Sequence, residues 1–290
     1  MSEERPRHRS ENPAGERNRR SRRPWLLVAI LALLLVALVV GALLLWRSLG
    51  EDLSGTATAS DSINATADPR VVLTNAAGQI NVEGVDDLRA VEFEVTKHAL
   101  GKDPATAKQR ASDVPVDVSR EGDEVNLRTS GGRGTGADYT LRVPTGASVQ
   151  IESEAGAVEV TGVDGGVEIL AEAGDVSVSE VQGSVTVEAP QGDVDVVAVS
   201  TDTGQVELDV GSGDISLEDL VVGTLEANVE SGDVVLSGRF SGGGRVFVGT
   251  GDVTTRLPAE DTRELTLEAN VGRVEREDAT SGDEPDSEGS

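Results

Sequence analysis

The fold is decided by the stretch VTVEAPQGDVDV, which covers residues 185–196. Apolar and polar residues alternate on both sides of Gly192, and this period of two is typical of strands with one buried face. Gly192 can adopt a positive φ and Asp193 can hydrogen-bond the backbone beside it, so the pair is typical of a turn. The stretch therefore predicts two short strands separated by a tight turn.

The same unit recurs at a regular interval along the chain. Each copy has an aliphatic residue, a glycine seven positions later and a second aliphatic residue two positions beyond the glycine. The copies are Val149–Gly156–Val158, Val167–Gly174–Val176, Val185–Gly192–Val194, Val206–Gly213–Ile215, Leu225–Gly232–Val234 and Leu265–Gly272–Val274. Val246–Gly251–Val253 is a copy shortened by two positions, and Val71–Gly78–Ile80 is an earlier copy that stands apart. From Gly156 to Gly272 these key glycines recur with a period of about 20 residues, which indicates a solenoid.

Stacking would bury the apolar face that a single unit cannot bury alone. We therefore expect an all-β fold, a β-solenoid or flattened β-helix of two-strand repeats over residues 149–276. Its sheets should face each other across a dry aliphatic core. The expected core residues include Val158, Val160, Val176, Val178, Val194, Val196, Ile215, Leu217, Val234 and Leu236.

Residues 70–148 are less regular and predict an N-terminal β subdomain that caps the solenoid. Strand patterns cover residues 71–85, 90–96, 114–120, 124–128 and 137–143. Residues 103–112 fit one short helix, with Asp103 as N-cap and Pro104 in the first turn.

Residues 25–46 form an unbroken apolar run with a tryptophan at each end. As a helix this run would span about 33 Å, close to the thickness of a bilayer core. The preceding residues 1–24 hold eight Arg against four Glu, whereas the chain after Arg47 is strongly acidic. The positive-inside rule then predicts a single-pass anchor in the cell membrane, a cytoplasmic Arg-rich tail and an extracytoplasmic C-terminal domain.

Two export signals compete with this anchor. A cleaved signal peptide has an apolar core of about 7–15 residues and a small-residue cleavage site, whereas this run is longer and residues 44–47 (LLWR) offer no such site. Residues 21–27 (SRRPWLL) resemble a twin-arginine signal. We favour an Arg-rich stop before an uncleaved membrane helix.

The remaining segments are polar. Residues 47–69 are rich in Ser, Thr, Ala and Asp without an apolar period, which predicts a flexible linker. Residues 277–290 are acidic and rich in Gly and Ser, which predicts a disordered tail.

Composition excludes several classes of function. A net charge of −27 argues against nucleic-acid partners, which need Lys and Arg. The chain has no cysteine, so disulfides, thiolate metal sites and Cys nucleophiles are excluded.

The order of features resembles a known family. The matching segments are residues 74–82 (TNAAGQINV), residues 139–147 (YTLRVPTGA) and Ser-Gly-Asp-Val repeats such as residues 231–234. They resemble the bacterial putative-adhesin family of β-strand-repeat ectodomains, a domain of unknown function, over roughly residues 70–275. The resemblance implies a surface role in adhesion, or in envelope-stress regulation for some relatives, and it carries over no catalytic residues.

No catalytic constellation stands out. Beyond residue 24 the only histidine is His98, so neither a Ser-His-Asp triad nor a histidine zinc site is expected. Paired carboxylates acting on a polysaccharide are a third alternative, which scattered acids and scarce aromatics disfavour. We expect no enzyme activity and no cofactor, with one reservation that concerns Ca²⁺.

Five key glycines are followed by aspartate, and in-register stacking would align these residues about 4.8 Å apart. They are Asp175, Asp193, Asp214, Asp233 and Asp252. Repulsion at that spacing in water is only about 0.9 kcal/mol per pair. Each Asp could bond local backbone N–H groups, or the ladder could hold Ca²⁺. We favour the structural turn, because the Gly-Gly-x-Gly-x-Asp repeat of calcium-binding β-rolls is absent.

The sequence thus predicts a membrane-anchored extracytoplasmic β-repeat protein. Its expected role is a non-catalytic adhesion or interaction scaffold at the cell envelope. The expected partners are the membrane, through the anchor, and an envelope or cell-surface protein or glycan. The alternative is a sensory or regulatory ectodomain in the envelope stress response.

Overall fold

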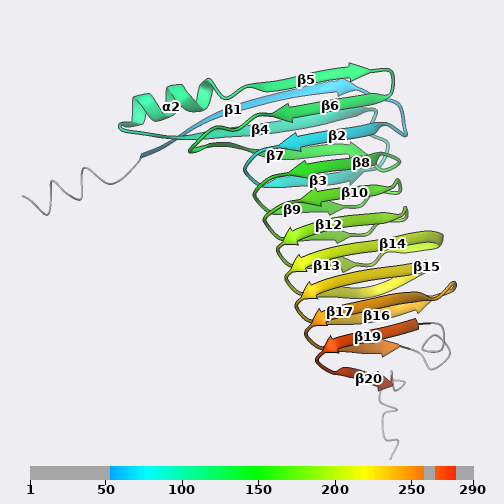
Figure 1. Ribbon diagram of the computed structural model, residues 1–290. Helices are drawn as coiled ribbons and strands as arrows, with labels where there is room; N and C mark the ends of the chain where they lie inside the picture. Colours follow the sequence, from blue (N-terminus) through cyan, green and yellow to red (C-terminus); the bar gives the residue numbers. More distant parts are fainter. Residues whose placement is uncertain (1–52, 258–264, 279–290) are drawn as a thin grey trace, which may run out of the picture. The chain divides into compact units, whose positions relative to one another are not determined.

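The computed structural model describes residues 53–257 and 265–278, in which one helix, α2 (Pro104–Ser112), accompanies strands β1 to β20 (Figure 1). The predicted tail 1–24 and transmembrane helix 25–46 lie outside the described residues, as does most of the predicted tail 277–290. Within the described ranges, no helix is long and apolar enough to cross a membrane.

The strands form two ladders, which the long strand β15 (Ile215–Ser231) joins. The β2 ladder runs in spatial order through β5 (Val116–Glu121), β6 (Glu124–Thr129), β2 (Arg70–Asn75), β8 (Ser148–Ser153), β10 (Val167–Ala171), β12 (Val185–Gln191), β14 (Ser200–Ser212), the second half of β15, β17 (Gly244–Thr250) and β19 (Leu265–Val271). The β3 ladder runs through β1 (Leu53–Asn64), β4 (Ala90–Gly101), β7 (Thr135–Pro144), β3 (Ile80–Val85), β9 (Val158–Thr161), β11 (Val176–Ser179), β13 (Val194–Val197), the first half of β15, β16 (Val234–Phe240), β18 (Val253–Leu257) and β20 (Val274–Asp278). The pairs are parallel except for β1–β4, β4–β7 and β5–β6 at the N-terminal end.

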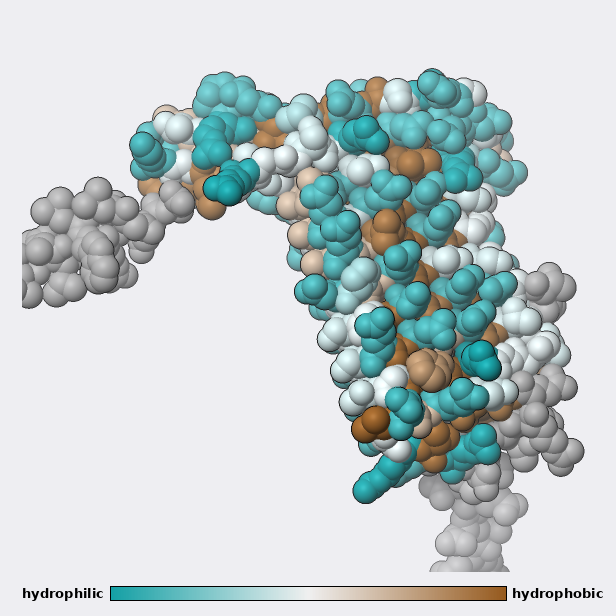
Figure 2. All heavy atoms as spheres, in the orientation of Figure 1, coloured by the Kyte–Doolittle hydropathy of each residue, from teal (hydrophilic) through white to brown (hydrophobic). Residues whose placement is uncertain are grey.

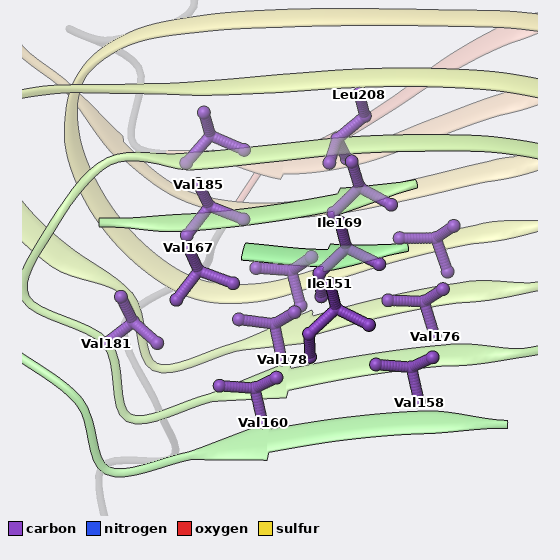
Figure 3. Close-up of a cluster of buried hydrophobic side chains, with 14 of the residues drawn as sticks. Ile151, Val158, Val160, Val167, Ile169, Val176, Val178, Val181, Val185 and Leu208 are labelled. Carbon is purple, nitrogen blue, oxygen red and sulfur yellow. The ribbon is translucent and has the colours of Figure 1, made fainter. Parts of the chain in front are cut away.

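Each coil of the solenoid consists of a strand of the β2 ladder, a turn at a key glycine and a strand of the β3 ladder. Equivalent residues stack directly, so that Val158 pairs with Val176 and Val176 pairs with Val194. The side chains of Val158 and Val176 point into the space between the ladders (Figure 3). The ten predicted core residues are each at most 1% exposed, so the predicted aliphatic core is confirmed. Burying one Val or Leu contributes about 1.5–3 kcal/mol, and stacking is what makes this burial complete.

The copy that stands apart in sequence is the first coil of the stack. β2 pairs with β8 and β3 pairs with β9, so residues 86–147 are an insertion between the first and second coils. The predicted boundary between residues 148 and 149 is therefore not a break in either ladder. The sequence suggested a β subdomain followed by a separate solenoid, because the first repeat copy lies far from the others in the chain. The parallel pairing of β2 with β8 and of β3 with β9 makes that copy continuous with the solenoid.

The copy predicted to be shortened by two positions has full length. Gly244 pairs with Leu225 on one side and with Leu265 on the other. Glycine therefore occupies the position that is aliphatic in the other copies, and Val246 is equivalent to Ala227. The prediction was wrong because it took the first valine of the segment as the start of the unit.

The predicted linker at residues 47–69 is also wrong for most of its length. Residues 53–64 form β1, which pairs antiparallel with β4 from Leu53↔Gly101 to Asn64↔Ala90. The strand shows no apolar period because only Ile63 packs against the main core. Its other inward positions carry small residues, which a reading based on hydrophobic alternation misses.

The helix α2 confirms the predicted helix. Asp103 Oδ1 accepts a 2.9 Å hydrogen bond from the backbone N–H of Thr106, and this bond lowers the pKa of Asp103. The helix packs closely on β1, because a Cβ at Gly55 would lie 2.3 Å from the backbone nitrogen of Lys108. β4 and α2 of the insertion thus form a compact arm together with β1, which precedes the first coil in sequence (Figure 1).

Candidate functional site

The key glycines stack along one edge of the solenoid and determine the geometry beside them. Their φ angles lie between +126° and +153° from Gly78 to Gly272. A Cβ at Gly192 would lie 2.1 Å from the carbonyl oxygen of Gly174 in the preceding coil. Only glycine allows both the positive φ and this close approach of two backbones. The residue after each glycine consequently falls into one straight column.

The predicted aspartate ladder occupies this column. The side chains of Asp175, Asp193, Asp214, Asp233 and Asp252 are exposed. The Oδ1 atom of each accepts a hydrogen bond from the backbone N–H of the equivalent residue in the next coil. The N···O distances are 3.1, 2.9, 2.8 and 2.7 Å between successive aspartates, and 2.7 Å from Arg273 to Asp252. The structural role is therefore supported, but the bonds link neighbouring coils instead of closing one turn.

The insertion contributes a similar contact at the top of the column. Asp138 Oδ1 accepts a 2.9 Å hydrogen bond from the backbone N–H of Gln79, which follows the first key glycine. Gln79 and Ala157 then interrupt the ladder, because neither carries a carboxylate. The sequence did not reveal the contact of Asp138, since that residue comes from a strand outside the repeat.

Calcium binding by the ladder stays a prediction. The ladder uses Oδ1 of each aspartate for the backbone bond described above. Within residues 53–257 and 265–278, no group of three or more His, Asp or Glu side chains has the arrangement of a metal site. A titration can decide between the two interpretations.

A shallow groove of about 600 Å³ runs along the aspartate column and over the adjoining strands of the β3 ladder. The aspartates Asp175, Asp193, Asp214 and Asp233 line it. Beside them lies the outward row of strand residues, which are Glu159, Ser177, Asp195, Ser216 and Val235. The groove offers acceptors and hydroxyl groups at the spacing of the coils, roughly 4.8 Å. It suits an extended ligand that carries hydrogen-bond donors at intervals.

The comparisons with known proteins agree with this architecture. The family model described as Toastrack DUF4097 matches residues 79–287, which is most of the chain. The chain belongs to the Toastrack family. The predicted resemblance to the β-strand-repeat family is thereby confirmed.

A solved structure shares the fold of this Toastrack chain. It is a putative adhesin from Bacteroides fragilis that is 12% identical, with a TM-score of 0.51, and the match covers 76% of this chain and 97% of that chain. A putative adhesin from Parabacteroides distasonis is 15% identical over the same shares of the two chains, with a TM-score of 0.41. A comparison with curated protein sequences finds no match.

The histidine of the Toastrack domain has a carboxylate neighbour that the sequence did not reveal. His98 Nδ1 on β4 lies 3.7 Å from Asp138 Oδ2 on β7, and both side chains are partly exposed. The strand register places Thr56 of β1 opposite His98 on the other side. These groups thus lie in a row across the adjacent strands β1, β4 and β7.

Buried polar residues lie at the N-terminal end of the Toastrack core. The hydroxyls of Thr129 and Tyr139 share a hydrogen bond, and Asn75 Nδ2 donates to the carbonyl of Ala137 at 2.9 Å. Burial raises the pKa of Tyr139. The cluster joins β2, β6 and β7, so it ties the insertion to the first coil. Asn75 lies in one of the segments that carried the family resemblance.

Proposed function

We propose that this Toastrack chain is a membrane-anchored, non-catalytic interaction scaffold at the bacterial cell envelope, with the groove along the aspartate ladder as its binding surface. The observation that carries the proposal is the register of the ladder. Equivalent carboxylates and hydroxyls repeat from coil to coil on a rigid support. Figure 2 shows hydrophilic residues along the visible outer surface of the stack, with hydrophobic residues between them.

Rigidity favours recognition by such a surface. Each inner coil is fixed by backbone hydrogen bonds to two neighbours and by the aliphatic core, and the coils from Asp175 to Asp252 are also linked by the aspartate bonds. A preorganised surface loses little conformational entropy when it binds. The partner that fits is an extended polymer with many hydrogen-bond donors, which describes an envelope glycan or an exposed segment of an envelope protein.

The same geometry argues against catalysis. Hydrolysis of a glycosidic bond needs an acid and a second carboxylate on opposite sides of one bond, about 5 to 9.5 Å apart. The ladder aspartates stand in a single row of a shallow groove, and the row beside them carries carboxylates only at Glu159 and Asp195. Each also holds the backbone of the next coil through Oδ1, which makes its position structural.

The location rests on the sequence and on relatives. The apolar run at residues 25–46 and the Arg-rich segment before it support a single-pass anchor with the solenoid outside the cytoplasm. The similar protein from Bacteroides fragilis is described as a putative adhesin, which agrees with an external role.

The absence of cysteine from the chain makes the topology directly testable. In intact cells, a membrane-impermeant maleimide should label Ser148→Cys, an exposed position at the start of β8. Ser10→Cys in the Arg-rich tail should stay unlabelled until the cells are permeabilised. Labelling of the tail variant in intact cells would overturn the proposed orientation.

The binding surface can be tested with two matched charge reversals. Asp195→Lys changes the groove, whereas Glu207→Lys changes an exposed outward position of the β2 ladder. The full chain should retain isolated cell-wall polysaccharide or solubilised envelope proteins, and Asp195→Lys should reduce this retention at least about tenfold. Equal retention by both variants, or none by the unaltered chain, would contradict the proposal.

A further inference from the structure

The strand β1 lies at the outer edge of the β3 ladder, and among the described residues it pairs only with β4. It is 12 residues long and carries one charged residue, Asp61, although 27% of the whole chain is charged. Long, uncharged edges are sites where another strand can add, and proteins normally block them with charges, proline or covering segments. The edge of β1 lacks most of these protections.

The hydrogen-bond pattern shows which backbone groups are free. In antiparallel pairs, alternate residues direct both backbone groups to the same neighbour. The bond from Ala65 N–H to the carbonyl of Arg89 lies in the β1–β4 register, so odd-numbered residues of β1 bond to β4. The bond from Leu100 N–H to the carbonyl of Gly134 shows that even-numbered residues of β4 bond to β7. The even-numbered residues of β1 therefore direct N–H and C=O groups to the free edge.

One end of this edge is closed. The backbone N–H of Ser62 donates to the carboxylate of Asp61 at 2.7 Å, and the carbonyl of Asn64 accepts from the Arg120 guanidinium. Both contacts involve even-numbered residues, as the register requires. The rest of the edge has no such contact within the described part of the chain. Its outward backbone groups belong to Ser54, Thr56, Thr58 and Ser60.

The open segment is complementary to itself. If two copies meet antiparallel about Ala57, Ser54 lies opposite Ser60 and Thr56 lies opposite Thr58. All four even-numbered residues then form hydrogen-bonded pairs with the partner copy. Their hydroxyl side chains share one face, where Ser and Thr pair favourably across strands. The opposite face carries Gly55, Ala57 and Ala59 in this segment, and α2 of the same copy packs on that face at Gly55.

We infer that two copies of this chain associate through antiparallel pairing of their β1 strands, centred on Ala57. The acid-poor edge explains why a second copy fits here despite the net charge of −27, since like-charge repulsion is smallest at this strand. The pairing joins the two β3 ladders into one continuous sheet. It is an isologous contact, so it ends at a dimer.

Disulfide trapping of the purified full-length chain tests this register, because any cross-link must involve an introduced cysteine. Ala57→Cys places two thiols in a non-hydrogen-bonded pair on the dimer axis, where the separation of the Cβ atoms suits a disulfide. Ser54→Cys is the matched control, because its equivalent in the partner lies roughly 20 Å away along the strand. Mild oxidation should trap at least about five times more dimer with Ala57→Cys than with Ser54→Cys. Equal trapping would overturn the inference.

A second variant separates edge pairing from loose association. Thr58→Pro removes an N–H that faces the free edge, at a position where edge strands tolerate proline. It spares the backbone bonds to β4 and loses only the 3.4 Å contact between the hydroxyls of Thr58 and Thr96. Combined with Ala57→Cys, it should reduce the trapped dimer to the level of Ser54→Cys while the melting temperature stays within a few degrees. Undiminished trapping would overturn the inference.

Discussion

The backbone N–H of Asp233 donates a 2.8 Å hydrogen bond to Oδ1 of Asp214, which lies one coil earlier in the stack. The same contact links Asp214 to Asp193 at 2.9 Å. Asp193, Asp214, Asp233 and Asp252 therefore each have two structural roles, because the backbone donates to the preceding aspartate and the carboxylate accepts from the next coil. The carboxylates of this column therefore link successive coils, and the same groups make the surface of the column acidic.

Two substitutions of Asp214 can separate the contribution of its charge from the contribution of its hydrogen bond. Asp214→Ala removes the acceptor and leaves the N–H of Asp233 without its partner, which should cost about 1 kcal/mol of unfolding free energy. Asp214→Asn keeps an oxygen at the same position and relieves repulsion with its neighbours, so it should be at least as stable as the unaltered chain. Urea unfolding measures both. A loss with Asn equal to the loss with Ala would show that the charge itself is required.

Calcium gives an independent test of the ladder. If the aspartates act as backbone acceptors only, millimolar Ca²⁺ should not raise the melting temperature beyond the effect of the same concentration of Mg²⁺. A specific site would add stability as RT ln(1 + [L]/Kd), about 2.7 kcal/mol at one hundred times the Kd. A calcium-specific rise that Asp214→Asn abolishes would establish the ladder as a cation site.

The repeat could be predicted because its information is local. Alternation around Gly192 identifies the strands, and the regular recurrence of the key glycines identifies the stack. The core follows, since inward positions are determined once the strands are known. The direction of the aspartate bond could not be predicted, because a contact between coils depends on the register of parallel strands.

Features outside the repeat were harder to predict. β1 is held by its backbone pairing with β4 and by the close packing of α2, which small residues such as Gly55 allow. The strand therefore shows no alternation of apolar and polar residues. The neighbour of His98 comes from β7, 40 positions later in the chain. These contacts depend on how the insertion folds back onto the first coil, and no short pattern encodes that path.

The key glycines should be intolerant of substitution. Gly192→Ala forces a residue with a Cβ into a φ of +140° and places that carbon 2.1 Å from the carbonyl oxygen of Gly174. Strain and overpacking together should cost about 3 kcal/mol or more. Gly166→Ala is the matched control, because its Cβ would meet only an atom 3.7 Å away. Its stability should change by no more than about 0.5 kcal/mol. Equal losses in chemical denaturation would disprove the stacking argument.

At Gly244, the repeat pattern of the sequence and the packing in the structure predict opposite effects of a substitution on stability. A consensus of the repeat would place an aliphatic residue there, as in Leu225 and Leu265 on either side. However, a Cβ at Gly244 would lie 2.3 Å from the carbonyl oxygen of Leu225. Gly244→Ala should therefore destabilise the solenoid by about 1–3 kcal/mol, where the pattern alone predicts a gain. A raised melting temperature for this variant would favour the pattern.

The last prediction concerns a polar residue in the aliphatic core. Thr255 stacks beneath Leu236, is 1% exposed, and its hydroxyl has no hydrogen-bond partner among the described residues. A buried hydroxyl without a partner loses its hydration without compensation. Thr255→Val keeps the branched shape and should stabilise the protein by about 1 kcal/mol. Thr254→Val, on the outward side of the same strand, should change stability little because its hydroxyl stays accessible to water. Thermal unfolding compares the pair, and a loss of stability in Thr255→Val would mean that its hydroxyl is satisfied in solution.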